Sequence, residues 1–302
     1  MKVLVTGYGS AGKRHINNLV AMNIETYVLT SYPDKRNDIK FVSFASECKD
    51  VDYAIIATPT GRHLTDLIDV SKNCPVKKIL IEKPVEASLE KAMEIKRFAE
   101  EAGITVLLAY NMRFLKVFDT IREYIEKNFS SIRLVKILAG QYLPEWRPYK
   151  DYRKSYSAHK DMGGGVDLDL SHEIDYMLWI FGVPSSVFFI LKEKISELDI
   201  DSADYFKGVY KYKNFIADVE LDYIRCKERR LSVAGENKEI VEVDFIKKYI
   251  KVMDGPLLQN ENLFDFDNSF VDELKEFLGL SPTNKLATLD ESINILKFIT
   301  KD

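Results

Sequence analysis

The sequence predicts an α/β protein with an N-terminal doubly wound parallel sheet and a C-terminal α+β domain on an open, mainly antiparallel sheet. Up to about residue 115, short apolar runs alternate with helical segments, and a glycine-rich turn follows the first run. Beyond it, segments of alternating polarity dominate. Continuous apolar strands separated by helices are typical of a parallel sheet covered on both faces. A chain of 302 residues favours two domains, which we expect at 1–115 and 116–302.

Apolar runs rich in β-branched residues predict the strands of the first domain, at 3–5, 26–30, 53–57, 78–81 and 104–108. Helices are expected at 10–22, 62–72 and 88–102. For the last of these, Ser88 is a suitable N-cap and Gly103 a suitable C-terminal stop.

The second domain is expected to contain strands at 133–138, 187–191, 204–212, 215–221, 230–234, 239–243 and 249–252. Helices are expected at 116–128, 168–181, 268–278 and 290–300. An open sheet has one face without helices, and an apolar free face favours subunit association. We therefore expect a homo-oligomer, a dimer or tetramer, through the C-terminal sheet; the alternative is that this face is simply polar.

Composition excludes several classes of function. The net charge is −4 and the basic residues are dispersed, so no nucleic-acid partner is expected. Cys48, Cys74 and Cys226 are too far apart for a disulfide framework or a cysteine zinc site, which fits a reducing cytoplasm. No apolar run reaches about 18 residues, so no membrane association is expected. Because a strand is expected from residue 3, a signal peptide is not; we expect a cytoplasmic protein.

The first apolar run leads into a turn with glycines at 7, 9 and 12, followed by a helix. In a dinucleotide site, Gly7 permits the tight turn, Gly9 permits close approach of a pyrophosphate, and Gly12 lets the helix pack on the strand. Ser10 and Ala11 then offer backbone N–H groups to the phosphates. The alternative is a glycine-rich turn without a ligand.

Unusual residues also follow three later strands, at the sheet edge where ligands of doubly wound sheets bind. Thr58-Pro59 with His63 follows one strand, Glu82-Lys83-Pro84 the next, and Asn111 lies beyond the third. We expect Thr58, Pro59, His63, Glu82, Lys83 and Asn111 to line the cofactor site. A lysine partly desolvated beside a cationic nicotinamide can exchange a proton near neutral pH, although Lys83 could also be an ordinary exposed lysine.

A triple-glycine segment, 163–165, precedes the expected helix at 168–181. Helical spacing would place Asp169, His172, Asp175 and Tyr176 on one face. A histidine beside a carboxylate is a candidate general acid/base, and the alternative is a helix-capping network. No metal site is expected, because no cysteine or second histidine lies near in sequence.

The segment before the glycines, 141–156, combines aromatic residues with arginines. Aromatic faces suit sugar rings or bases, and arginines suit carboxylates or phosphates. Arg147, Tyr152 and Arg153 are therefore expected to bind substrate. The alternative is a loop that packs across the domain interface.

Together, these motifs resemble the glucose–fructose oxidoreductase/inositol dehydrogenase (Gfo/Idh/MocA) family over most of the chain. The resemblance implies a Rossmann domain for NAD or NADP and a second domain whose sheet mediates oligomers. It implies a substrate that is a sugar, cyclitol or sugar-nucleotide derivative. The family's catalytic lysine falls on Lys83 and its histidine on His172. Its aspartate four residues before the histidine corresponds to Leu168, whereas Asp169 lies three before.

The end of the second strand suggests which cofactor binds. An NAD site usually carries a carboxylate there for the ribose 2′-hydroxyl. This chain has Thr30 and Ser31, with Arg36 beyond, and hydroxyls and cations suit a 2′-phosphate. NADP is therefore favoured over NAD, although Asp34 could reach back instead.

The resulting hypothesis is hydride transfer between a nicotinamide and a secondary alcohol or ketone of a carbohydrate-like substrate. Lys83, His172 and Asp169 would be catalytic, and all three would also contact substrate. One alternative is a non-catalytic dinucleotide sensor of the same fold, against which the retention of Lys83 and His172 argues. Another is a reductase of a non-sugar substrate such as a tetrapyrrole or imine.

Overall fold

The computed structural model describes residues 1–253, 255 and 257–300. It divides into two compact units. Unit 1 comprises Met1–Phe114 and Asp267–Leu296, and unit 2 comprises Leu115–Phe266 and the residues from Lys297. No helix in the described ranges is both long and apolar enough to cross a bilayer.

Unit 1 is built on a seven-stranded sheet, sheet A, with the order β3-β2-β1-β4-β5-β6-β15. Its strands are β1 (Lys2–Thr6), β2 (Glu25–Leu29), β3 (Lys40–Val42), β4 (Tyr53–Ile56), β5 (Lys78–Glu82), β6 (Thr105–Ala109) and β15 (Ala287–Thr288). The strands pair in parallel except for β15, an antiparallel edge strand. This confirms the predicted doubly wound sheet, whose direction of winding reverses between β1 and β4.

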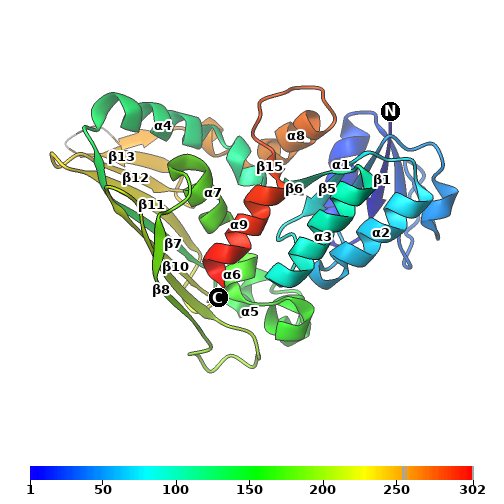
Figure 1. Cartoon of the computed structure of the whole chain (residues 1–302), viewed down its shortest axis with the longest axis horizontal. Helices are drawn as coiled ribbons and strands as arrows, with labels where there is room; N and C mark the ends of the chain where they lie inside the picture. Colours follow the sequence, from blue (N-terminus) through cyan, green and yellow to red (C-terminus); the bar gives the residue numbers. More distant parts are fainter. Residues whose placement is uncertain (254, 256, 301–302) are drawn as a thin grey trace. The chain divides into compact units, whose positions relative to one another are not determined.

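The helices of unit 1 are α1 (Ser10–Ala21), α2 (His63–Asn73), α3 (Leu89–Ala102), α8 (Phe266–Phe277) and α9 (Leu289–Ile299) (Figure 1). The predicted limits of α3 are confirmed. The Ser88 side chain accepts a hydrogen bond from the Lys91 N–H, and Gly103 ends the helix with φ of +62°.

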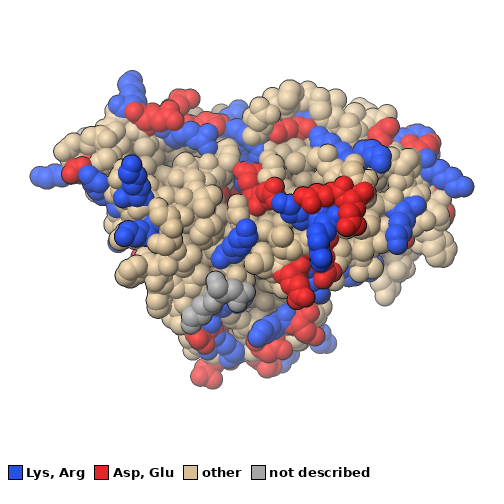
Figure 2. Space-filling view, in the orientation of Figure 1, with Lys and Arg blue, Asp and Glu red and all other residues tan. Residues whose placement is uncertain are grey.

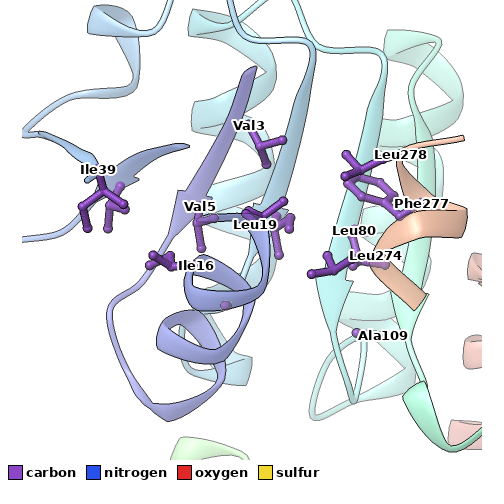
Figure 3. Close-up of a cluster of buried hydrophobic side chains, with 13 residues drawn as sticks. Val3, Val5, Ile16, Leu19, Ile39, Leu80, Ala109, Leu274, Phe277 and Leu278 are labelled. Atoms are coloured by element: carbon purple, nitrogen blue, oxygen red, sulfur yellow. The ribbon is translucent and has the colours of Figure 1, made fainter. Parts of the chain in front are cut away.

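The core of unit 1 includes side chains from the far end of the chain. Leu274, Phe277 and Leu278 pack in one buried cluster with side chains of β1 and α1, including Val5 and Leu19 (Figure 3). The compact units therefore differ from the expected division into 1–115 and 116–302. The first boundary lies where we expected it, but α8 and most of α9 return to unit 1, because α8 buries its apolar side against the Rossmann core.

Unit 2 contains an eight-stranded sheet, sheet B, with the order β14-β13-β12-β11-β7-β10-β9-β8. Its strands are β7 (Ile132–Gly140), β8 (Ser186–Glu193), β9 (Tyr205–Lys211), β10 (Ile216–Asp222), β11 (Glu228–Gly235), β12 (Ile240–Asp244), β13 (Tyr249–Val252) and β14 (Leu257–Gln259). Among the described strands of sheet B, only β7 and β10 pair in parallel, which confirms a mainly antiparallel sheet. The short strands β3, β14 and β15 were not predicted.

The helices of unit 2 are α4 (Lys116–Asn128), α5 (Leu143–Trp146), α6 (Val166–Asp169) and α7 (His172–Phe181). The single helix predicted at 168–181 is wrong. Leu170 leaves helical geometry, with φ of −99° and ψ of 32°, and separates α6 from α7. Asp169 and His172 thus belong to different helices, so the periodicity of a single helix does not place them on one face.

The two faces of sheet B differ. Helices α6 and α7 pack on one face, where Val135 and Ile137 of β7 are buried. The alternate residues Leu134, Lys136 and Leu138 point to the opposite face and are partly or fully exposed. No helix in the described part of the chain covers that face (Figure 1). On the side of the molecule seen in Figure 2, acidic and basic residues are interspersed, as the dispersed charges of the sequence predict.

Replacing Phe277 by Ala tests whether α8 is part of the core of unit 1. Phe277 is fully buried, and its ring packs edge-on against Tyr53 with 5.4 Å between centroids. We expect Phe277→Ala to lower the free energy of unfolding by about 3–5 kcal/mol, measured by urea denaturation. Leu280→Ala is the control, because Leu280 is 55% exposed and should change stability by less than about 0.5 kcal/mol. Equal effects of the two changes would contradict this assignment.

Candidate active site

The glycine turn combines two tightly packed glycines with one that faces open space. A Cβ on Gly7, where φ is +93°, would lie 2.6 Å from the Ala57 oxygen, and one on Gly12 would lie 2.2 Å from the Gly7 oxygen. A Cβ on Gly9 would meet no described atom within 4 Å. The turn therefore packs closely on β1 and β4 but leaves room in front of α1. Its first backbone N–H groups, from Ser10 and Ala11, suit the pyrophosphate of a dinucleotide.

The end of β2 carries the residues expected at the adenosine end of the cofactor. Thr30 Oγ1 accepts a hydrogen bond from the Tyr32 N–H at 3.2 Å, and Ser31 is exposed. The Arg36 guanidinium donates to the carboxylate of Asp38 and to Asn17 Oδ1 of α1. The sequence analysis identified Arg36 but neither of these two partners.

The end of β4 is held by α2. Thr58 Oγ1 donates to Asp66 Oδ2 at 2.5 Å, and His63 lies buried between the Thr58 oxygen (3.0 Å) and the Val85 oxygen (3.1 Å). Pro59 immediately precedes the short 3₁₀ turn Thr60–Arg62. His63 thus connects the Thr58-Pro59 turn to the segment after Lys83. Within unit 1, the buried His63 ring therefore stabilises the Thr58-Pro59 turn.

Glu82, at the end of β5, is joined to α1 by His15. His15 Nε2 and Glu82 Oε1 are 2.7 Å apart, and the His15 side chain is only 1% exposed. Burial raises the pKa of Glu82, but the hydrogen bond with His15 and the charges of His15, Lys83 and His63 outweigh it, so the pKa lies below its usual value. His15, which follows the glycine turn in the family resemblance, was given no role from the sequence, although its position on the buried side of α1, between Gly12 and Leu19, could have indicated one.

Lys83 follows Glu82 and is half-buried, and a cis peptide bond joins it to Pro84. Asn111, the other expected cofactor residue of unit 1, lies in the 3₁₀ turn Asn111–Phe114. Its Nδ2 donates to Ser269 Oγ of α8 at 2.7 Å, and only 4% of the residue is exposed. The Asn111 amide therefore fastens α8 to the end of β6.

In unit 2, Asp169 lies at the centre of a cluster of hydroxyl groups. Ser157 Oγ and the Tyr223 hydroxyl each donate to Asp169 Oδ2 at 2.6 Å, and the Tyr156 hydroxyl also bonds to this carboxylate. Burial, followed by the charge of Asp169, raises the pKa of Tyr156. The sequence analysis missed these three partners, which come from segments distant from α6. Asp169 thereby holds the segment before the glycines against the end of β10.

His172 begins α7 and is partly exposed. The next residue, Glu173, is fully buried, and its Oε1 lies 2.7 Å from Arg229 Nε of β11. Asp175 and Tyr176 are also fully buried, and the Tyr176 ring packs on Phe118 of α4. The predicted shared face is therefore wrong: Asp175 and Tyr176 belong to the interior of unit 2, and of the residues predicted for that face only His172 is partly exposed.

The candidate substrate residues have different surroundings. The Arg147 guanidinium lies 5.8 Å from the ring centroid of Tyr156, beside the Asp169 cluster. Arg153 is instead paired with Asp151 by two hydrogen bonds of 2.9 Å, and the Tyr152 hydroxyl accepts from the Asp199 N–H. The structure thus associates Arg147, but not Arg153, with Asp169 through Tyr156.

One surface cluster contains residues that can bind metals. His159, Asp161 and Asp201 place one ligand atom each within 4.8 Å of one another. His159 Nε2 already bonds to the Arg153 oxygen at 2.7 Å, and Asp201 Oδ1 accepts from the Lys160 N–H. These bonds account for much of the arrangement without an ion.

Two family models match the chain. The model described as "Oxidoreductase family, NAD-binding Rossmann fold" covers residues 1–110, and the "GFO/IDH/MocA C-terminal domain" covers residues 118–241. The chain belongs to the Gfo/Idh/MocA family. As a member of this family it carries an NAD-binding Rossmann fold in unit 1, where the glycine turn and the end of β5 lie.

Several proteins resemble this family member. The scyllo-inositol 2-dehydrogenase (NADP(+)) IolW of Bacillus subtilis is 26% identical over 62% of this chain and 53% of its own length. The rhizopine catabolism protein MocA of Rhizobium meliloti is 27% identical over 49% of this chain and 44% of its own. The match to each thus spans about half of that relative.

A solved structure is similar over nearly the whole chain. The WlbA dehydrogenase of Bordetella pertussis, in complex with NADH and UDP-GlcNAcA, superposes with a TM-score of 0.79 at 17% identity. The alignment covers 98% of this chain and 92% of that one. At this identity the similarity establishes the fold.

The Glu82–His15 pair makes part of the stability of unit 1 depend on pH. Because the pKa of Glu82 is lowered by folding, its contribution is present above the ordinary carboxyl pKa of 4.5 and is lost as the pH falls below that value. We expect the difference in unfolding free energy between the wild type and Glu82→Gln to be largest near neutral pH and to shrink in acid. Urea denaturation across the pH range measures it, and a pH-independent difference would contradict the assignment.

Proposed function

We propose that this protein is a dehydrogenase or reductase that transfers a hydride between a nicotinamide dinucleotide and a secondary alcohol or ketone of a sugar, cyclitol or sugar-nucleotide derivative. The observation that carries the proposal is the pairing, within unit 1, of an open glycine turn with the Glu82-Lys83-Pro84 segment. Glu82 is bonded to the helix that follows the turn, so the lysine is held in fixed relation to the phosphate site. IolW and WlbA, named as dehydrogenases, support the reaction class.

The free space in front of Gly9 and the first N–H groups of α1 fit the cofactor pyrophosphate. When bound, the cofactor supplies the nicotinamide that accepts or donates the hydride. Thr58 and Pro59 at the end of β4, with Lys83 at the end of β5, would border this ring. His63 and Asn111 would support the site indirectly. His63 holds the backbone of the Thr58-Pro59 turn, and Asn111 holds α8.

The chain's own residues would manage the proton of the reacting hydroxyl. In the oxidative direction, the substrate oxygen loses a proton as its carbon loses a hydride, and in reduction it gains one. Lys83 and His172 are the groups we assign to hold this proton at the oxygen. Asp169 would support the substrate-binding segment. Arg147 and Tyr152 would contact the substrate, and Arg153 would have to leave Asp151 in order to do so.

We further propose NADP as the preferred cofactor. The end of β2 presents Thr30 and Ser31 in place of a carboxylate, and Arg36 lies beyond them. Hydroxyl and guanidinium groups donate hydrogen bonds to a 2′-phosphate, whereas an aspartate at this position would repel it. The relative IolW is named for NADP(+), which supports this choice.

For the oligomer, we propose association through the open face of sheet B. Leu134, Leu138 and Val209 lie on this face, between rows of charged residues. Some of those charges are paired: Lys207 bonds to Asp218 at 2.6 Å, and Arg225, just beyond β10, lies 2.5 Å from Glu220. These pairs reduce the unbalanced charge on the face, which favours burial of the apolar residues between them.

Removing either proposed proton carrier should abolish most of the turnover. We expect Lys83→Ala and His172→Ala each to lower kcat by about 100-fold or more, with the NADPH dissociation constant changed by less than about threefold. Turnover is measured on a panel of sugars, cyclitols and sugar nucleotides, and cofactor binding by NADPH fluorescence. Lys77→Ala, an exposed lysine before β5, is the matched control. Dinucleotide binding without turnover on any substrate would instead favour a sensor.

The oligomer proposal predicts a change of mass on a single substitution. The wild type should have at least the mass of a dimer in light scattering, and Leu138→Glu should reduce it to a monomer, because Leu138 lies in the middle of the open face between Glu220 and Arg230. Leu280→Glu, on exposed Leu280 of unit 1, should leave the mass unchanged. A monomeric wild type at micromolar concentration would rule this interface out.

A further inference from the structure

Arg36 joins three segments around the glycine turn. Its Nη1 donates to Asn17 Oδ1 of α1 at 2.7 Å, and its guanidinium also bonds to the hydroxyl of Tyr8, which lies between Gly7 and Gly9. The Tyr8 ring packs edge-on against Phe41 of β3, and the Lys13 ammonium lies 4.5 Å from its centroid. The guanidinium is therefore fixed beside the turn, on the side of the sheet where β2 ends.

Asp38 occupies the edge of this guanidinium best suited to a phosphate. Arg36 Nε donates to Asp38 Oδ1 at 2.9 Å, and Nη2 donates to Asp38 Oδ2 at 2.6 Å. An arginine binds the two oxygens of a carboxylate or a phosphate through the same parallel pair of N–H groups. A phosphate that approaches Arg36 in this geometry must displace the carboxylate or bind a less favourable edge.

The charge of Asp38 strengthens this competition. The hydrogen bond from Arg36 lowers the pKa of Asp38, so the carboxylate is ionised at neutral pH. Its negative charge neutralises that of Arg36 and so reduces the attraction of the guanidinium for a second anion. The Asp38 side chain is 46% exposed and that of Arg36 24%, so solvent weakens the pair but does not abolish it.

We propose that Asp38 is a specificity-determining residue that competes with the cofactor's 2′-phosphate for Arg36 and so limits the preference for NADP over NAD. The inference rests on the proposed function, since it concerns the adenosine end of the same cofactor site. The segment between β2 and β3 then carries two groups with opposite effects. Arg36 attracts the 2′-phosphate, and Asp38 competes with the phosphate for the hydrogen bonds of Arg36. A substitution at Asp38 then changes cofactor choice without any change at the end of β2.

The test is the binding of NADPH and NADH to wild type and Asp38→Asn, measured by fluorescence titration at fixed ionic strength. Asparagine keeps the side-chain shape but removes the charge. We expect the dissociation constant for NADPH to fall about tenfold and that for NADH to change by less than about twofold. Raising the salt concentration should reduce the gain, because the effect is electrostatic.

Two further comparisons isolate the mechanism. Asp69→Asn removes the same charge from an exposed position of α2, where Asp69 accepts from Asn73 Nδ2 rather than from Arg36, so NADPH should bind as it does to wild type. In an Arg36→Ala background, adding Asp38→Asn should give no gain, because the group for which carboxylate and phosphate compete is absent.

An equal gain from Asp69→Asn, a gain that survives Arg36→Ala, or unchanged or weaker NADPH binding by Asp38→Asn would each overturn the role of Asp38. All three results leave the dehydrogenase proposal intact, since the protein still binds a dinucleotide. Failure of the wild type to bind either dinucleotide would overturn the proposed function itself, and this inference with it.

Discussion

The arrangement of unit 1 depends on a steric constraint at the start of α1. The positions where Gly7 and Gly12 would carry a Cβ are already filled by the Ala57 and Gly7 oxygens, so a side chain at either position would force the turn away from β1 and β4. Close contact there brings the helix N-terminus to the edge of the sheet. Gly9, between them, faces open space. The same turn therefore packs tightly and leaves a place for a ligand.

Helix α1, once fixed by this turn, contacts the segments at both ends of the proposed cofactor site. His15 reaches Glu82, the residue before Lys83, and Asn17 reaches Arg36, beyond the end of β2. A rigid helix keeps these two contacts at a constant separation. In the proposed function, this helix would therefore hold the segment before Lys83 and the segment beyond β2 in a constant relation to each other.

The elements that could be predicted from the sequence are those set by local patterns. The features that could not be predicted depend on contacts between distant segments. The apolar runs and the Ser88 and Gly103 helix signals gave the parallel sheet and α3 correctly, because both are local. The break at Leu170 had no such signal, since the 168–181 segment keeps helical periodicity across it. The partners of Asp169 escaped notice because Ser157 and Tyr223 come from separate segments. The return of α8 to unit 1 likewise depends on a core that no local pattern specifies.

The buried pair of Glu173 and Arg229 has a consequence for how α7 is held on sheet B. Apolar contacts between a helix and a sheet tolerate substitution, because the side chains can repack and the helix can shift slightly. A buried ion pair does not tolerate such a shift. Moving the helix by one turn, about 5.4 Å, would separate the two charges and leave them unpaired away from water. The pair therefore fixes the position of α7 along sheet B, and with it the position of His172 at the start of the helix.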